Sequence, residues 1–225
     1  MKLILDRKSY FVDTVIKIAK TFAEMNFQVS SAGVRLCAPN MNNTIMVEGL
    51  LQSPQDSDYT FNIQMSDLAD IFTSFDKGDI ELTCDGVTLK AVQGKKVITQ
   101  RLNDCQEMPS IPPVPLPNSF IARGEDLFDF IKLFKGFETI GFDVAPDSLS
   151  CLAEVKAKTV QNALDINLSG DSCHSNYKVA QLMGVLEVFK GQVQVSIADK
   201  YPLLIELQGS ETMDLKVLVA PSGEE

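Results

Sequence analysis

The residues best placed for chemistry in this sequence are a cysteine and the only histidine of the chain, which are neighbours at Cys173 and His174. A thiol in contact with an imidazole can act as a nucleophile with its general base. Consecutive residues of an extended chain point in opposite directions, however, so neighbours make this contact poorly. A zinc site needs several ligands at close spacing, and no cysteine has a partner at C-x-x-C spacing. We therefore expect an ordinary loop histidine and no metal site.

Two other patterns that enzymes use give little support for catalysis. Asp67 and Asp70 share one helix face, as a general acid and base would, but solvated carboxylates on a helix are far more common. The sequence holds no G-x-x-x-x-G-K-[ST] phosphate-binding loop, so we expect no ATP chemistry of that kind. The expectation is a protein that is not an enzyme and binds no cofactor.

Composition limits the compartment and the partners. The chain has 225 residues, enough for one large or two smaller domains, and a formal net charge of −10. No apolar run is long enough to span a membrane, and the first residues do not resemble a secretory signal. Five scattered cysteines indicate reduced thiols in a reducing compartment. The acidity disfavours nucleic acid as a partner, although only the distribution of charge decides what one face can bind.

A proline-rich segment lies near the middle of the chain. Residues 103–118 hold five of the ten prolines, namely Pro109, Pro112, Pro113, Pro115 and Pro117. Proline lacks an N–H and pushes the preceding residue towards extended conformations. The segment is therefore predicted to be neither a helix nor a central strand, and we interpret it as a stiff connector.

The sequences on either side of this connector follow one plan. A shift of 114 residues aligns the apolar stripes of two amphipathic helices, pairing Leu68 with Leu182, Ile71 with Val185, Phe72 with Leu186, and Phe75 with Phe189. Each half also begins with a short strand and a first helix, and strand-like stretches such as Phe27–Leu36 fill the rest. The prediction is an α+β fold of two duplicated domains, 1–102 and 119–225, joined by the connector 103–118.

Lysines stand on or beside the four predicted helices. They are Lys17, Lys20, Lys77, Lys132, Lys135 and Lys190. In one interpretation they are ordinary solvated lysines, and those at helix C-termini also interact favourably with the helix dipole. In the other, the helices align their lysines on one basic surface while the acidic residues lie elsewhere. Spacing alone leaves both interpretations open.

Several stretches, taken in order, resemble one known family. They are FQVSSAGVRLCAPN followed by TIMVEGLLQS, then MSDLADIFTSFDKGDIELT, the connector, and the final YPLLIELQGSETMDLKVLVAPSGEE. Together they resemble the sliding clamps of the proliferating cell nuclear antigen (PCNA) family over essentially the whole chain. None of these stretches is a catalytic signature.

The resemblance implies a specific architecture and function. Two similar clamp domains per subunit and three subunits would close a ring, with helices lining a central channel and antiparallel sheets outside. Double-stranded DNA would pass through without sequence preference, held by the six lysines named above. The ring would tether DNA polymerase and other enzymes of replication and repair, and an ATP-dependent clamp loader would open it. The clamp itself would do no chemistry.

Two more sets of residues follow from the resemblance. The pocket that accepts a short hydrophobic motif of partner enzymes matches Pro39, Asn40, Met41, Thr44, Ile111, Pro112, Pro202, Leu218, Ala220 and Pro221. The strands that join subunits match two stretches, with Lys95, Lys96, Val97, Thr99 and Arg101 in the first and Leu164, Asp165, Ile166 and Leu168 in the second.

Three assemblies remain open on the sequence: a homotrimer, a subunit of a heterotrimeric or checkpoint-type clamp, and an interaction scaffold that does not encircle DNA. The expected location is the cytoplasm of an archaeal or virus-infected cell, or the nucleus of a eukaryote, and we do not expect the protein to be secreted.

Overall fold

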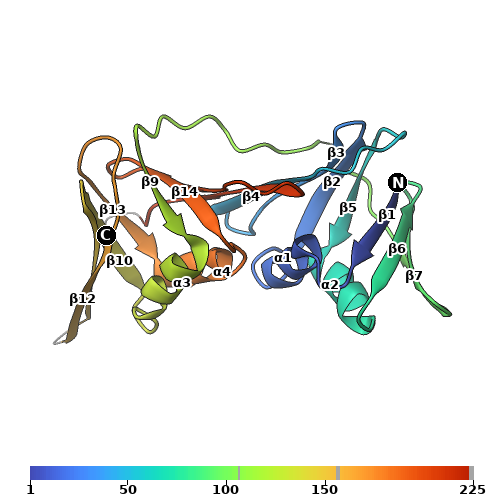
Figure 1. Cartoon of the computed structure of the whole chain (residues 1–225), viewed down its shortest axis with the longest axis horizontal. Coiled ribbons are helices and arrows are strands. Elements are labelled where there is room, and N and C mark those ends of the chain that lie inside the picture. Colours follow the sequence, from blue (N-terminus) through green and yellow to red (C-terminus); the bar gives the residue numbers. More distant parts are fainter. Residues whose placement is uncertain (106, 156–157, 223–225) are drawn as a thin grey trace. The chain divides into compact units, whose positions relative to one another are not determined.

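The computed structural model describes residues 1–105, 107–155 and 158–222. The chain forms two compact units that exchange short segments. Unit 1 consists of Met1–Asn43, Val47–Ser110 and Ser210–Leu215, and unit 2 of Thr44–Met46, Ile111–Gly209 and Lys216–Glu225. Figure 1 shows that each unit places a pair of helices against strands.

The first half of the chain contains two helices and eight strands among the described residues. In order they are β1 (Lys2–Asp6), α1 (Tyr10–Ile18), β2 (Glu24–Ser30), β3 (Gly33–Pro39), β4 (Ile45–Leu51), β5 (Tyr59–Gln64), α2 (Met65–Ser74), β6 (Asp79–Cys84), β7 (Thr88–Gln93) and β8 (Lys96–Arg101). Hydrogen bonds give the strand orders β1-β6-β7-β8 and β5-β2-β3-β4.

The second half repeats this order of elements. They are β9 (Asn118–Arg123), α3 (Gly124–Lys132), β10 (Thr139–Ala145), β11 (Ser148–Val155), β12 (Lys158–Asp165), β13 (Cys173–Lys178), α4 (Val179–Leu186), β14 (Gln192–Ile197), β15 (Leu203–Leu207) and β16 (Met213–Val219). The strand orders β9-β14-β15-β16 and β13-β10-β11-β12 match those of the first half, strand for strand. β16 is thus the duplicate of β8, and β12 is the duplicate of β4.

The helices form where the apolar periodicity predicts them, because one face of each is buried on the strands. All eight residues of the aligned stripes of α2 and α4, extended to Phe75 and Phe189, are buried. Phe11 of α1 meets Phe72 of α2 edge to face, with ring centroids 6.5 Å apart. α1 begins at an N-cap in which the side chain of Ser9 accepts from the backbone of Val12. The predicted duplicated α+β fold is confirmed.

One predicted strand is two strands in the structure. The stretch Phe27–Leu36 turns back on itself between β2 and β3, which pair as an antiparallel hairpin. Gly33 at this turn has φ of +133°, and a Cβ there would lie 2.2 Å from the carbonyl oxygen of Leu51. Only glycine fits a backbone with this φ and this close approach.

The connector contains no helix among its described residues, and its first strand-like contact is a single bridge between Asn103 and Asn62. Its prolines therefore act as the sequence predicts. We keep the division into 1–102, 103–118 and 119–225 as a proposal for the limits of the two repeats.

Candidate functional site

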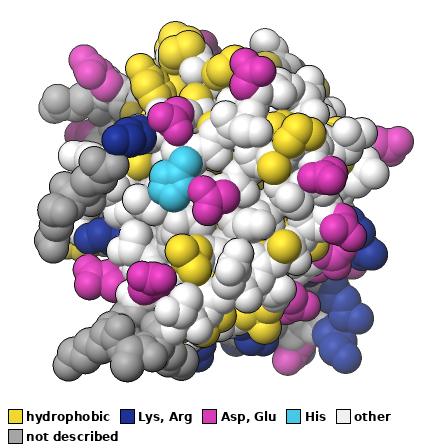
Figure 2. Space-filling model, turned by 90° about the vertical axis from the view of Figure 1, so that its left-hand side faces the viewer, with side chains coloured by type: hydrophobic (Ala, Val, Ile, Leu, Met, Phe, Trp, Pro, Cys, Tyr) yellow, Lys and Arg dark blue, Asp and Glu magenta, His cyan; other side chains and the backbone are white. Residues whose placement is uncertain are grey.

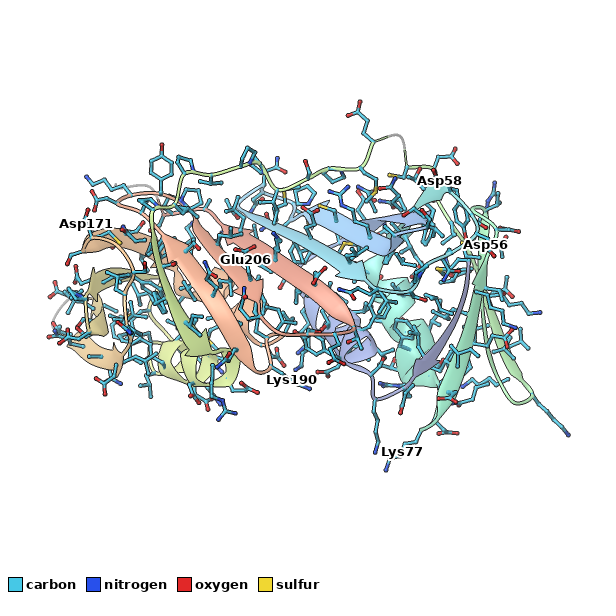
Figure 3. The ribbon with its side chains drawn as sticks, turned by 45° about the horizontal axis from the view of Figure 1, so that its top comes forward. Asp56, Asp58, Lys77, Asp171, Lys190 and Glu206 are labelled. Atoms are coloured by element: carbon cyan, nitrogen blue, oxygen red, sulfur yellow. The ribbon has the colours of Figure 1, made fainter. Side chains whose placement is uncertain are left out.

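Four of the six predicted DNA-binding lysines lie just after the ends of the helices. Lys20 follows α1, Lys77 follows α2, Lys135 follows α3 and Lys190 follows α4, each two to four residues beyond the last helical residue. All four are exposed, and Figure 3 shows Lys77 and Lys190 extending away from the ribbon. We call them the helix-end lysines. A cation at this place is stabilised by the negative end of the helix dipole.

The other two lysines lie within helices and differ in their surroundings. Lys17 is the least exposed, with 18% of its side chain accessible, because its ammonium group pairs with the carboxylate of Asp13 at 3.1 Å. Lys132 is exposed, and its Nζ lies 6.0 Å from the centre of the Phe128 ring. Lys17 therefore presents less charge to solvent than the other five lysines, because the helical spacing that turns it from the core also brings it onto Asp13.

Acidic residues share the helices with the lysines. α2 carries Asp67 and Asp70, and α3 begins with Glu125 and Asp126. The carboxylate of Glu125 accepts hydrogen bonds from the backbone N–H of Gly191 at 3.1 and 3.2 Å. Hydrogen bonds from its own N–H and that of Gly191 lower the pKa of Glu125. The helix bodies thus carry charges of both signs, and the exposed helix-end lysines lie beyond them.

β8 ends its sheet and pairs with no second strand among the described residues. The N–H of Leu102 donates to the carbonyl of Val87 at 2.8 Å, which fixes the alternation along the β7–β8 ladder. The backbone groups of Ile98 and Gln100 then face β7, and those of Val97, Thr99 and Arg101 face away. These last three residues were all predicted at the subunit interface.

The two lysines predicted beside them lie in the β7–β8 turn and at the start of β8. Lys95 lies in the β7–β8 turn, next to Gly94. The ammonium group of Lys96 donates to the carbonyl of Ser74 and lies 5.5 Å from the centre of the Phe75 ring. Lys96 thus binds the C-terminal end of α2 in its own unit, which is a structural role.

β12 ends the sheet of unit 2 in the same manner, with β11 as its one partner in the described chain. Ile166 donates to Asp147 at 3.1 Å and Leu168 to Pro146 at 2.9 Å, so both N–H groups are already used within the chain. By the same alternation Leu164 faces β11. Of the four predicted positions, Asp165 alone turns its backbone outward.

Alternation from Asp165 adds Ala163, Gln161 and Thr159 to the outward residues of β12. Ala163 begins the stretch that the resemblance matched to the interface, and sequence reasoning missed Gln161 and Thr159. The N–H of Ala163 binds the side-chain oxygen of Asn162 at 2.9 Å, so this group must leave Asn162 to bind another strand. The register between β11 and β12 identifies these residues, but that register cannot be read from the sequence alone.

The residues predicted to form the partner-peptide pocket fall in both units. In unit 1, Pro39 ends β3, and Asn40 and Met41 follow in an exposed turn in which Asn43 donates to Asn40 at 2.9 Å. Met41 is 86% exposed, more than any other large hydrophobic residue that is exposed in the described chain.

In unit 2, Thr44 and Ala220 are neighbours, since the Ala220 N–H donates to the Thr44 carbonyl at 2.7 Å. The hydroxyl of Thr44 accepts from the side chain of Gln181, also at 2.7 Å. Leu218 lies on β16 opposite Leu204, and the remaining members are Ile111 and Pro112 in the connector, Pro202 before β15 and Pro221 after β16.

Cys173 and His174 do not form a catalytic pair. Cys173 is buried, and burial raises the pKa of its thiol, which disfavours the thiolate. The imidazole Nδ1 of His174 instead lies 2.6 Å from a carboxylate oxygen of Asp143, on the neighbouring strand β10. Figure 2 shows the histidine at the surface beside an acidic side chain. Asp67, the other candidate, accepts a hydrogen bond from Gln100 at 3.1 Å.

Within the described residues, no group of three or more His, Cys, Asp or Glu side chains is arranged to hold a metal ion. None of the described helices has the length and apolar character needed to cross a membrane.

Comparison with known proteins gives the fold. No family sequence model and no curated protein sequence matches the chain. Among solved structures, the PCNA of A. fulgidus, determined with the C-terminal region of FEN-1 bound, matches 100% of this chain and 99% of its own at a TM-score of 0.88 and 18% identity.

Two further structures agree. The PCNA of Entamoeba histolytica matches 99% of this chain and 98% of its own at a TM-score of 0.85 and 16% identity. A chain of the PCNA2–PCNA3 complex of Sulfolobus tokodaii matches 100% of this chain and 100% of its own length at a TM-score of 0.84 and 14% identity. The chain therefore has the fold of PCNA sliding clamps from end to end, as the sequence resemblance predicts.

Proposed function

We propose that this protein is a DNA sliding clamp that encircles duplex DNA as a trimeric ring and tethers enzymes of replication and repair. The observation that carries the proposal is the match of the whole chain to PCNA structures, with each half built as one clamp domain. The protein acts as a platform for other enzymes and is not itself one.

The duplication supports a ring closed by strand pairing. In unit 2 the end of β16 is bound by the segment Thr44–Met46, through the Ala220–Thr44 hydrogen bond. β8 is the duplicate of β16 and presents the outward backbone groups of Val97, Thr99 and Arg101. β12 presents those of Thr159 to Asp165. Exposed strand edges favour pairing with another chain, so β8 of one copy pairs with β12 of the next, and head-to-tail contacts of this kind close a ring.

DNA contact falls to the helix-end lysines, with Lys132 beside them and Lys17 contributing little because of Asp13. Contacts from such lysines go to phosphates, so they are independent of sequence and weaken with salt. The pocket residues named above accept the hydrophobic motif of a DNA polymerase or another enzyme, and an ATP-dependent loader opens the ring. The site of action is wherever the DNA is replicated, in the cytoplasm or the nucleus.

A second assembly has its own support. The matching Sulfolobus tokodaii structure is a complex of two different PCNA chains. On that precedent this chain is one subunit of a mixed ring, which needs sister chains to close.

The mass of the purified chain in solution separates the two. A homotrimer has three times the chain mass of 24.7 kDa, about 74 kDa, by light scattering after size exclusion. The next measurement is retention on DNA after loading, which a ring shows on a closed circle and loses when the circle is cut. A stable 24.7 kDa monomer at micromolar concentration rejects the homotrimer and favours the mixed ring. Equal retention on circular and cut DNA rejects encirclement.

A further inference from the structure

The connector is held on unit 1 by an arginine that lies far from it in the sequence. Nη2 of Arg35, on β3, donates to the carbonyl of Pro109 at 2.9 Å. The same guanidinium group binds the carboxylate of Glu48, on β4, with Nε and Nη2 each 2.9 Å from Oε1. Both charged side chains are about a quarter exposed. Glu48 thereby holds the guanidinium group in place, and an N–H of Nη2 binds the connector.

Two weaker contacts precede this one along the connector. The backbones of Asn103 and Asn62 exchange two hydrogen bonds of 2.9 Å. The hydroxyl of Thr60 donates to the carbonyl of Cys105 at 3.1 Å. The Arg35 contact is the last of the three, and Ile111, a predicted pocket residue, follows Pro109 by two positions.

The chemistry of the connector explains why a cationic donor stands here. Its five prolines have no N–H, so the segment offers more carbonyl oxygens than N–H groups to whatever holds it. A neighbouring strand supplies donors and acceptors in equal number, whereas arginine supplies only donors. Arginine also keeps its charge at any physiological pH, so the contact does not depend on protonation.

The second unit serves as an internal comparison. The pairs Ser30–Gly33 and Ala145–Ser148 stand next to the turns of the two equivalent hairpins, β2–β3 and β10–β11. Arg35 and Ser150 each lie two residues beyond that pair, so Ser150 is the duplicate of Arg35. Ala163 pairs with Ser150 on the neighbouring strand β12, the duplicate of β4. The fold thus forms in unit 2 without the charged pair. The clamp domain can therefore be built without this charged pair, and in unit 1 the pair also contacts the connector.

We propose that Arg35 and Glu48 form a clasp that fixes the connector on unit 1 and so positions Ile111 for the hydrophobic motif of partner enzymes. This inference rests on the proposed function. The clasp orders the connector before a partner arrives, so less conformational entropy is lost when the partner binds. Arg35 is a positioning residue, since it acts through the connector.

The test compares the full-length wild type with Arg35→Ala, Glu48→Gln and Arg35→Lys. The matched control is Lys2→Ala, which removes the exposed Lys2–Glu81 pair of 3.2 Å in the same unit. Hydrogen exchange of residues 107–111 is measured without any partner. We expect exchange about tenfold faster in Arg35→Ala, the scale of one charged hydrogen bond, and less of a change in Arg35→Lys. Glu48→Gln removes the negative charge that binds Arg35 but keeps the shape of the side chain, so its effect is not due to a general loss of fold.

The second measurement is the affinity for a synthetic peptide from the C-terminal region of FEN-1. We expect Arg35→Ala to bind about tenfold more weakly, Arg35→Lys to recover part of the loss, and Lys2→Ala to bind as the wild type does. Exchange that is unchanged in Arg35→Ala overturns the clasp. Faster exchange with unchanged peptide affinity overturns its positioning role. If the wild type does not bind the peptide, the docking of partners in the proposed function is contradicted. The exchange measurement still decides whether the clasp holds the connector, because it needs no partner.

Discussion

A single proline in β8 tests whether copies of this chain pair through their strand edges. Thr99→Pro removes an N–H that faces away from β7 and has no strand partner among the described residues. Proline is tolerated in an edge strand at such a position, so the single chain should fold with nearly unchanged stability. In the ring, the lost N–H would leave a carbonyl of the neighbouring copy without its donor.

The expected size follows from that geometry. A buried carbonyl left without its donor costs about 1–3 kcal/mol. Each interface therefore weakens by about 1–3 kcal/mol, or about fivefold to 150-fold in its dissociation constant. Every subunit contributes one such interface, so the ring should dissociate at protein concentrations at which the wild type stays closed.

The neighbouring position provides the opposite control. Gln100 faces β7 with its backbone, and its side chain binds Asp67 at 3.1 Å. Gln100→Pro should therefore lower the free energy of unfolding of the chain itself by about 3 kcal/mol or more. Mass by light scattering over a dilution series and urea unfolding at 25 °C measure the two effects. A Thr99→Pro protein that stays near three times 24.7 kDa at low micromolar concentration would refute pairing through β8.

Three further predictions concern charge, pH and backbone conformation. Replacing all four helix-end lysines with glutamate should abolish retention on closed circular DNA while leaving the thermal midpoint of unfolding within a few degrees. In the wild type, four phosphate contacts per chain would contribute about −3.6 to the slope of the logarithm of the DNA-binding constant against the logarithm of the salt concentration. Retention equal to that of the wild type would show that these lysines do not contact DNA. Glu125→Gln should lower the free energy of unfolding by more at pH 7 than at pH 3, because hydrogen bonds lower the pKa of this carboxyl in the folded state and their contribution, present above the ordinary glutamate pKa, is lost as pH falls through the folded value; an equal deficit at both pH values contradicts it. Gly33→Ala should cost about 3 kcal/mol or more in urea unfolding, since a Cβ there meets the Leu51 carbonyl at 2.2 Å, whereas Gly94→Ala, in open space at φ of +59°, should cost about 1 kcal/mol.

Periodicity made the helices predictable. Leu68, Phe72 and their duplicates recur at helical spacing because one face of each helix is buried, and a single sequence records that burial directly. The duplication was visible for the same reason, since two copies of one unit bury equivalent positions. The connector was predictable because proline restricts the backbone whatever surrounds it.

The site was less predictable, because its features depend on which strands meet. The clasp joins Arg35 to a carbonyl 74 positions away, and the sequence around either residue does not indicate that the two are in contact. The outward residues of β12 depend on its register with β11, and a register that differs by one residue exchanges the inward set for the outward set. The pairing of Lys17 with Asp13 was not predicted, because helical spacing gives the direction of a side chain but not its partner.

The placement of the basic residues bears on how an acidic protein could hold DNA and still move along it. Each helix-end lysine stands where the helix dipole leaves about half a negative charge, so part of its field is offset before it reaches a phosphate. Exposed lysines on flexible side chains also contact phosphates as point charges without fixed geometry. In the proposed ring, such lysines would attract the duplex at short range with no preferred register along it, because every phosphate offers the same contact. In the proposed ring, residence on DNA then comes from closure by β8 and β12, and the Thr99→Pro ring should lose DNA even with every lysine intact.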